Sequence, residues 1–130
     1  MTTPGVCCVI GAGDATGSAV ARRFARAGYT VCVARRTEAA LQPLVDKIVA
    51  QGGRARAYGL DARREDQVAR FFSQVEAEVG SVAVVVFNVG GNVRFPILDT
   101  TAQKYFKVWE MCALAGFLVG REASRVMLPR

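Results

Sequence analysis

Short runs of apolar residues alternate along the chain with longer segments in which apolar residues recur every three or four positions. A continuous apolar run predicts a strand buried on both faces, whereas the longer spacing predicts an amphipathic helix. The first strand is expected at residues 6–10, followed by a glycine-rich turn at 11–17. The helix that comes next has as its core-facing positions Val20, Phe24 and Ala27. Gly28 is expected to end this helix as its C-cap.

The pattern continues with a second strand at residues 30–34 and a helical segment at 37–51. Thr37 is expected to cap this segment. Pro43 has no N–H to donate, so it is expected near the first position of a helix that restarts after an initial turn. A third strand at 54–60 is less apolar than the others, which places it near the edge of a sheet.

The second half of the chain begins with a helix at residues 65–79 and a strand at 82–87. The helix has one apolar stripe, formed by Val68, Phe72, Val75 and Val79. The strand is expected to be the most deeply buried in the sequence because every one of its residues is apolar. A loop at 88–99 leads to a capping-box spacing at 100–103, which opens a long helix over residues 101–128.

The chain is therefore expected to contain four strands, each followed by a helix. This alternation predicts right-handed crossovers and a doubly wound parallel sheet of the Rossmann type, in a three-layer α/β/α arrangement. The dinucleotide-binding sheet has the order 3-2-1-4-5-6, so four strands are expected to form an incomplete sheet in the order 3-2-1-4. Residues 1–130 are expected to be one domain, with a ligand outside the carboxyl ends of the first and fourth strands.

The composition fits one compact domain and excludes several chemistries. The chain has 130 residues, of which 52% are hydrophobic, and it has no histidine. This excludes a Ser-His-Asp or Cys-His relay, a two-histidine zinc helix and an imidazole base. The start, MTTPG, does not resemble a leader, and no apolar stretch is long enough to cross a bilayer. We expect a cytoplasmic protein with no membrane contact.

The cysteines lie in apolar runs and lack the CxxC spacing of zinc and redox sites. They are Cys7, Cys8, Cys32 and Cys112. We expect them to be small buried residues that form neither disulfides nor a metal site.

The formal net charge is +6, from 17 basic and 11 acidic residues. The arginines are scattered over several predicted helices and do not gather with aromatic residues on one face. Nucleic-acid binding is therefore disfavoured, because a solvated basic surface with one phosphate site accounts for the charge.

The turn after the first strand has the context of a phosphate-binding loop, because a helix follows it directly. Its candidate ligand-binding residues are Gly11, Gly13, Asp14, Ala15, Thr16 and Gly17. Glycines permit a close approach of the backbone, and the helix N-terminus presents free N–H groups to a pyrophosphate. The strict GxGxxG pattern fails because Thr16 occupies its third small position, and the P-loop pattern fails because no lysine follows. The alternative is a purely structural turn.

The loop fits the looser pattern GxxxGxG, with Ala15 in the middle glycine position. Matching strand ends are Arg35-Arg36 in the second, Asp61-Ala62 in the third and Asn88-Val89-Gly90 in the fourth. The last helix has Trp109, Cys112 and Phe117 at the spacing of a Trp-x-x-Asn segment followed by Phe-Leu-Val. Together these segments, spread over the whole chain, resemble the short-chain dehydrogenase/reductase family.

The resemblance implies that a nicotinamide dinucleotide is the cofactor. Arg35 and Arg36 would accommodate the 2′-phosphate of NADP(H), so NADP(H) is expected to be preferred over NAD(H). The alternative is a solvated basic pair. Asp61, followed by Ala62, would lie near the adenine ring, and its alternative role is to cap a helix.

The resemblance also implies that Asn88, with Val89 and Gly90, steadies the central sheet and borders the cofactor. The alternative is an ordinary turn asparagine.

Two residues depart from the family pattern. Asp14 puts a carboxylate into the phosphate loop, and we expect it to cap the first helix through the N–H of Thr16 or Gly17 and to point aside. Cys112 stands where the family has an active-site asparagine, and a thiol is a poor substitute as donor and acceptor.

In the family, a tyrosine and a lysine spaced Tyr-x-x-x-Lys, and a serine, perform catalysis after the fifth strand. None of the tyrosines of this chain, Tyr29, Tyr58 and Tyr105, has a lysine four positions on. The chain is therefore expected to be the cofactor-binding part of an NADP(H)-dependent oxidoreductase, truncated before its catalytic segment and inactive by itself. The resemblance implies hydride transfer between nicotinamide and a small carbonyl or alcohol substrate. The alternative is a non-enzymatic NADP(H)-binding or interaction module.

The last helix would expose an apolar stripe that includes Phe106, Trp109 and Phe117. We expect the helix at 101–128 to pair with a second copy, which would make the protein a homo-oligomer.

Overall fold

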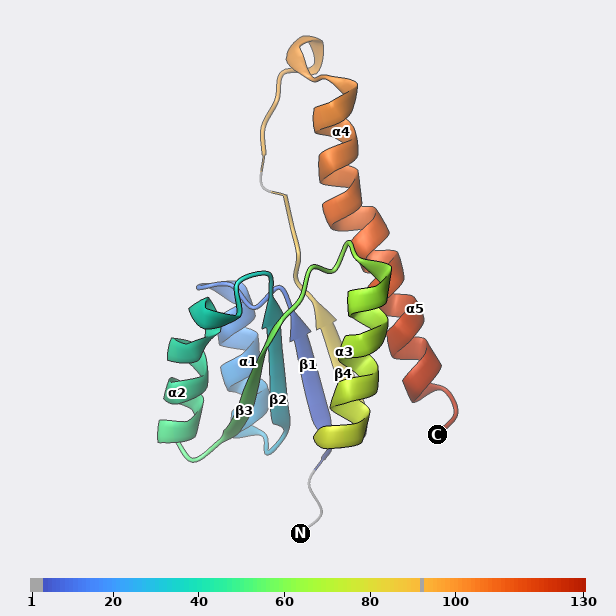
Figure 1. Cartoon of the computed structure of the whole chain (residues 1–130). Coiled ribbons are helices and arrows are strands. Elements are labelled where there is room, and N and C mark those ends of the chain that lie inside the picture. The colour runs from blue at the N-terminus through green and yellow to red at the C-terminus, as the bar shows by residue number, and fades with distance from the viewer. Residues whose placement is uncertain (1–3, 92) are drawn as a thin grey trace.

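The computed structural model describes residues 4–91 and 93–130. Residues 1–3, on which the expected lack of a leader partly rests, and residue 92 in the expected 88–99 loop lie outside the described residues. In the described part, four parallel strands form one sheet in the order β3-β2-β1-β4, and helices cover both of its faces (Figure 1). The predicted fold class and strand order are confirmed.

Each strand is followed along the chain by one or more helical segments. The strands are β1 Val6–Ile10, β2 Thr30–Arg35, β3 Arg54–Gly59 and β4 Val82–Phe87. The α-helices are α1 Thr16–Arg26, α2 Gln42–Ala50, α3 Glu65–Glu78, α4 Ala102–Trp109 and α5 Ala115–Met127. Shorter segments are the 3-10 turns η1 Glu38–Leu41 and η2 Ile97–Asp99 and the π-helical η3 Glu110–Leu114. None of these helices, taken over the described residues, has the length and apolar character that crossing a bilayer requires.

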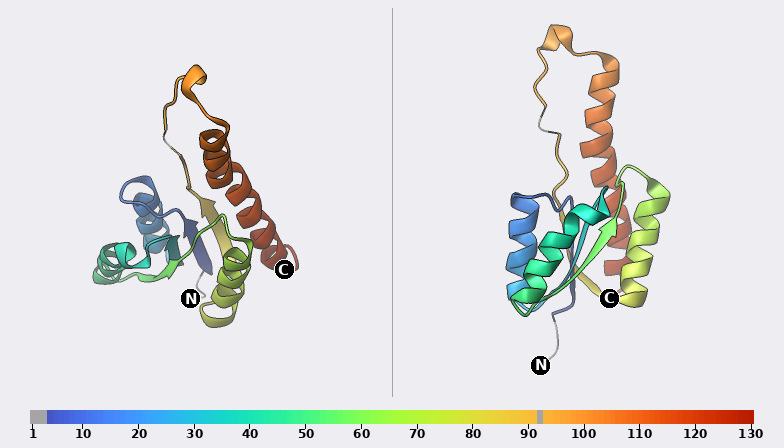
Figure 2. Two further views of the ribbon diagram at one scale, coloured as in Figure 1. Left: turned by 45° about the horizontal axis from the view of Figure 1, so that its top comes forward. Right: turned by 60° about the vertical axis from the view of Figure 1, so that its left-hand side comes forward.

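Strand β1 is at the centre of the packing. It pairs in parallel with β2 and with β4, and each of its residues is buried. Its residues alternate between two cores: Cys7 and Val9 belong to the core under α1 and α2, whereas Cys8 and Ile10 belong to the core under α3 and α5. Figure 2 shows these helix pairs on opposite faces of the sheet. The continuous apolar run at residues 6–10 is therefore a strand covered on both faces, as predicted.

Helix α1 packs closely on the sheet through small residues. Gly17 and Ala21 are buried, whereas Ala27, expected in the core, is exposed because it lies beyond the last turn of the helix. A Cβ on Gly17 would lie 2.6 Å from the Gly11 carbonyl oxygen, so the start of α1 touches the glycine loop. The C-cap of α1 is Ala27 and not Gly28, so that prediction is wrong by one residue. Gly28 directly follows the C-cap with a φ of 95°, a conformation that favours glycine at the end of a helix.

The segment at 37–51 divides at its proline, as predicted. The turn η1 leads directly into α2, and Pro43 lies in the first turn of α2, where a missing N–H breaks no helical hydrogen bond. Thr37 occupies the cap position of η1, but its side chain accepts no capping hydrogen bond.

The outer strands of the sheet are β3 and β4. The edge position of β3 is confirmed. The prediction that residues 82–87 form the most deeply buried strand is wrong: in β4 only Val82 is buried, and Ala83 is exposed. The physical reason is that, among the described strands, β4 has a neighbour on one side only, whereas β1 and β2 have neighbours on both sides.

The predicted long helix over 101–128 is continuous from 102 to 127, but its middle is the π-helical segment η3, which joins α4 to α5. Figure 1 shows α4 extending away from the sheet. The helix also starts one residue later than the capping-box spacing implies. Thr101 Oγ1 accepts a hydrogen bond from the Lys104 N–H at 3.2 Å, and the Thr100 hydroxyl donates to the Pro96 carbonyl at 2.9 Å.

All four cysteines are free thiols. Cys7, Cys8 and Cys32 are buried, as predicted, but Cys112 is only half-buried. Burial raises the pKa of Cys7 to about 12. The hydrogen bond to Cys32, together with burial, also raises the pKa of Cys8. Cys7 and Cys8 are therefore protonated at neutral pH and act as small apolar residues.

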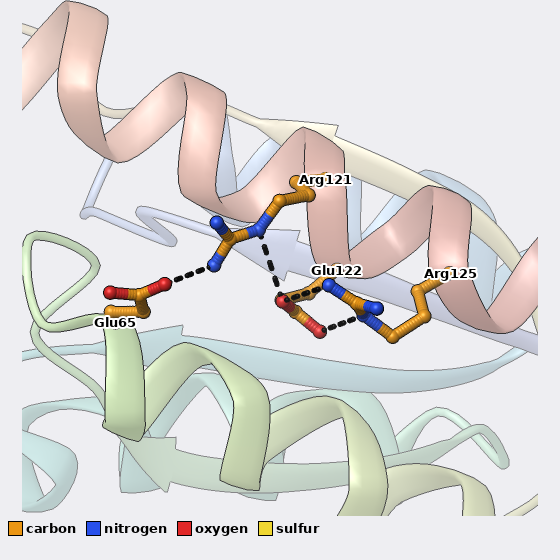
Figure 3. Close-up of polar contacts among 4 residues, drawn as sticks. All are labelled: Glu65, Arg121, Glu122 and Arg125. Atoms are coloured by element: carbon orange, nitrogen blue, oxygen red, sulfur yellow. Dashed lines mark hydrogen bonds and ion pairs between the residues drawn. The ribbon is translucent and has the colours of Figure 1, made fainter.

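An ion-pair network around a buried carboxylate of α5 reaches α3 through an arginine (Figure 3). Glu122 on α5 is 7% exposed and accepts hydrogen bonds from Arg125 Nε at 3.0 Å and from Arg121 Nε at 3.2 Å. Arg121 reaches across to Glu65 at the start of α3. Hydrogen bonding to Arg125 is the main cause that lowers the pKa of Glu122, so the carboxylate is charged at neutral pH.

We predict that Glu122→Gln lowers the free energy of unfolding by about 1–3 kcal/mol, because charge-assisted hydrogen bonds to a buried group are lost. Chemical denaturation of the two proteins measures this difference. Glu65→Gln is the matched control: its carboxylate contacts the same Arg121 but is 66% exposed, so the cost should stay below about 1 kcal/mol. Equal costs for the two variants would contradict the assignment.

The difference in stability between the parent and Glu122→Gln should also depend on pH. A carboxyl group whose pKa is lower in the folded state stabilises the fold above its ordinary pKa of 4.5, and this contribution is lost as the pH falls through the lowered folded value. The advantage of the parent over Glu122→Gln should therefore be constant near neutral pH and shrink on acidification. An advantage that stays constant on acidification would show that the charge of Glu122 is not involved.

Candidate functional site

A cleft of about 300 Å³ lies at the carboxyl ends of the strands, and we refer to it as the strand-end cleft. Its walls are formed by Ile10, Gly11, Gly13, Ala34, Arg35, Arg36, Thr37, Leu60, Asp61, Ala62, Arg63, Asn88, Val89, Gly90, Met111 and Ala115. The cleft therefore collects residues that follow all four strands, including β1 and β4, where a ligand is expected.

The glycine loop closes one side of the strand-end cleft. Gly11 has a φ of 86°, and its N–H donates to the Ala34 carbonyl at 2.9 Å. The Asn88 side-chain amide donates to the Gly11 carbonyl at 3.2 Å. A Cβ on Gly11 would lie 2.6 Å from the Asn88 carbonyl oxygen. The loop is thus held between the ends of β2 and β4 at a distance that only glycine permits.

Two further glycines of the cleft lie at positions where the packing of the protein would allow a side chain. A Cβ on Gly13 or on Gly90 would meet no atom of the described chain within 4 Å, and neither residue has a positive φ. Both line the strand-end cleft. The missing side chains leave open space beside the cleft, where a bound group can approach the backbone.

The predicted role of Asp14 as a helix cap is wrong. Ala15 occupies the N-cap position of α1, and no side chain caps the helix there. The Ser18 hydroxyl instead donates to the Gly13 carbonyl, which closes the turn from inside the helix. The Asp14 side chain is 97% exposed and faces Arg35, with Oδ1 at 3.6 Å from Nη1.

The sequence-predicted residues divide into two groups. Those that line the strand-end cleft are Gly11, Gly13, Arg35, Arg36, Asp61, Ala62, Asn88, Val89 and Gly90. Of the others, Asp14, Ala15 and Thr16 are exposed beside it, and Gly17 is buried beneath the loop. Cys112 is absent from its lining, which takes Met111 and Ala115 from that part of the chain.

Sequence reasoning missed Arg63, which lines the strand-end cleft. Arg63 Nε and Nη2 each donate to the Asp61 carboxylate at 2.9 Å, and the Arg63 N–H donates to it at 3.1 Å. These bonds are the main cause that lowers the pKa of Asp61, so this carboxylate is charged at neutral pH. The alternative role of Asp61 as a helix cap is wrong, because the N-cap of α3 is Arg64. The sequence feature that could have identified Arg63 is its position directly after Asp61-Ala62, the segment at the end of the third strand that matches the family pattern.

The charges of the strand-end cleft are unequal. Arg35, Arg36 and Arg63 face it, with Asp61 as the carboxylate in its lining. The negative charge of Asp61 is paired with Arg63 through two side-chain hydrogen bonds, which leaves Arg35 and Arg36 as an excess of positive charge. A cleft of this kind favours an anionic ligand such as a phosphate. Among its described lining residues there is no tyrosine, lysine, serine or histidine, so the lining supplies no common proton donor for catalysis.

Comparisons with known proteins give a consistent result. The model of the short chain dehydrogenase family matches residues 5–130. A short chain dehydrogenase from Pseudocercospora fijiensis is 39% identical over 126 residues, which are 94% of this chain and 40% of that protein. The crystal structure of a short-chain dehydrogenase from Rhodopseudomonas palustris has 48% sequence identity and a TM-score of 0.93, covering 98% of this chain and 60% of that one.

A third similar protein is a metagenomic short-chain oxidoreductase whose crystal structure was solved in complex with NADP. It is 26% identical, with a TM-score of 0.91, and the match covers 98% of this chain and 58% of that one. The chain therefore spans between 40% and 60% of the length of these similar proteins.

Proposed function

The chain belongs to the short-chain dehydrogenase family, and on this basis we propose that it forms the NADP(H)-binding part of an oxidoreductase acting on a carbonyl or alcohol. Nicotinamide, when bound, supplies or accepts the hydride. The observation that carries the proposal is the strand-end cleft, which combines open glycine backbone with an excess of arginine charge. The NADP complex of a similar protein supports the choice of cofactor.

The residues present fit a dinucleotide. Gly13 and Gly90 leave room for the ligand beside the backbone, and the N-terminus of α1 presents N–H groups with a partial positive charge to a pyrophosphate. Asn88 holds the loop in place through the Gly11 carbonyl. Asp61 is oriented by Arg63 in the same cleft, where we assign it to the adenine end of the ligand.

Arg35 and Arg36 are proposed to bind the 2′-phosphate that distinguishes NADP(H) from NAD(H). Both line the strand-end cleft at the end of β2. Guanidinium groups donate paired hydrogen bonds to phosphate, and such charge-assisted bonds are stronger than neutral ones. The preference for NADP(H) follows from this pair.

The proton for the substrate oxygen is proposed to come from a part of the full protein that this chain does not contain. None of its tyrosines has a lysine four positions on, and the chain spans 40% to 60% of the length of its relatives. The alternative, a non-enzymatic NADP(H)-binding module, has the same cleft and differs only in lacking turnover.

We also propose that α4 and α5 carry a contact between two copies of the protein. Large side chains along them are exposed by 45% to 59%, namely Tyr105, Phe106, Trp109 and Phe117. An apolar surface of this kind is usually covered by a partner.

The first prediction of the proposed function concerns cofactor choice. In a fluorescence titration of the full-length protein, NADPH should bind more tightly than NADH. Arg35→Ala should weaken NADPH binding by about tenfold or more, because a charge-assisted bond to phosphate is lost, and leave NADH binding within about threefold. Arg70→Ala is the matched control, since it removes an equal charge from an arginine on α3 that is 73% exposed and outside the cleft.

Equal affinities for NADPH and NADH in the parent would overturn the assignment of Arg35 and Arg36. The same preparation tests hydride transfer, by NADPH oxidation with a panel of aldehydes and ketones. Oxidation above background is expected, and tight binding without any oxidation would favour the non-enzymatic module.

A second prediction separates the glycines by role. Gly13→Ala should leave the Tm within about 2 °C, because the added Cβ meets no protein atom, yet weaken NADPH binding by about tenfold or more. Gly17→Ala is its counterpart and should lower the free energy of unfolding by about 1–3 kcal/mol, because its Cβ would lie 2.6 Å from the Gly11 carbonyl oxygen. Unchanged binding by Gly13→Ala would show that the ligand does not approach this loop.

A third prediction tests the contact between copies. Light scattering of the full-length protein should give the mass of a dimer or larger assembly. Phe106→Lys should reduce that mass, whereas Leu98→Lys, which changes a residue 95% exposed outside α4, should not. A monomeric parent, or an assembly unaffected by Phe106→Lys, would refute the proposed contact.

A further inference from the structure

The fold makes no visible use of the charge of Asp14. Its side chain is 97% exposed, it does not cap α1, and no hydrogen bond of its carboxylate is found in the described part of the chain. A carboxylate in a loop suited to phosphate opposes the ligand rather than attracting it. The position therefore calls for a role other than stability.

The contact that Asp14 does make is with a residue of the strand-end cleft. Its Oδ1 lies 3.6 Å from Arg35 Nη1, and Arg35 is 33% exposed. Within the described residues, Asp14 is the one carboxylate that forms an ion pair with Arg35, and Arg36 forms none. The two arginines at the end of β2 are thus unequal, since one is partly neutralised before any ligand arrives.

We propose that Asp14 is a specificity-determining residue that weakens the preference for NADP(H) by competing with the 2′-phosphate for Arg35. The inference rests on the proposed function, because it concerns the same arginine and the same phosphate. NADPH must displace the carboxylate from Arg35, and its phosphate then lies near a like charge. NADH carries no 2′-phosphate and meets neither cost.

The size of the effect follows from the geometry. Asp14 is exposed and the pair is longer than a hydrogen bond, so the carboxylate is easily displaced, and a phosphate carries more charge than a carboxylate. NADPH therefore binds in spite of Asp14, with an affinity that is lower by about three- to tenfold. The result is a protein that discriminates less between the two cofactors than its arginine pair alone would.

The test measures dissociation constants of NADPH and NADH for the full-length parent and for Asp14→Asn, which keeps the shape of the side chain and removes its charge. We expect NADPH to bind about three- to tenfold more tightly to Asp14→Asn and NADH to bind within about twofold of the parent. Glu78→Gln is the matched control. Glu78 is also an exposed carboxylate 3.9 Å from an arginine, Arg56, but it lies at the far end of α3, so both affinities should be unchanged.

A double variant tests whether Asp14 acts through Arg35. On the Arg35→Ala background, Asp14→Asn should change NADPH binding by less than about twofold, because the competition has been removed. An equal gain on both backgrounds would show that the carboxylate acts directly on the ligand and would overturn the proposed competition.

Two other results would also overturn it. Weaker NADH binding by Asp14→Asn, with NADPH unchanged, would mean that the carboxylate accepts a hydrogen bond from the ribose. In the second, Arg35→Ala weakens NADPH binding, but Asp14→Asn binds NADPH and NADH with the same affinities as the parent. This result would leave the proposed function intact and refute this inference alone. If neither cofactor binds to the parent, the proposed function itself has failed.

Discussion

The close packing of the Gly11 backbone between the ends of β2 and β4 is the constraint on which the site depends. Gly11 donates to Ala34 on one side and accepts from Asn88 on the other, and a Cβ would overlap the Asn88 carbonyl. Because β1 is buried on both faces, the strand cannot shift to relieve such an overlap. The direction in which the chain leaves β1, the start of α1 and the opening of the strand-end cleft all follow from this one contact.

The parallel order of the strands then decides which charges meet. Every strand ends at the same edge, so Arg35, Asp61 and Asn88, which are far apart along the chain, line one cleft. Arg63 engages both carboxylate oxygens of Asp61, which leaves the arginines at the end of β2 without a strong partner. The cleft is electropositive because the fold pairs one arginine well and pairs Arg35 only weakly, at 3.6 Å.

Much of this arrangement could be predicted from sequence because it depends on local periodicity. The apolar run at 6–10, the glycine loop and Pro43 each specify a structure within a few residues. The failures depend on distant contacts. The burial of β4, for example, is decided by whether a further strand lies beside it. The partner of Asp14 is Arg35, which follows another strand, so helix-cap rules could not identify it.

The π-helical segment η3 has a consequence for the site. A π turn holds more residues than an α turn, so the helix faces before and after it are offset relative to a regular helix. Motif spacing matched Cys112 to a family asparagine, but spacing along the sequence does not fix the direction of a side chain inside such a segment. In the structure Met111 and Ala115 line the strand-end cleft, and Cys112 between them does not. The end of the cleft formed by η3 and α5 is consequently apolar where the family motif implies a polar group, and a ligand there meets a thioether and a methyl group.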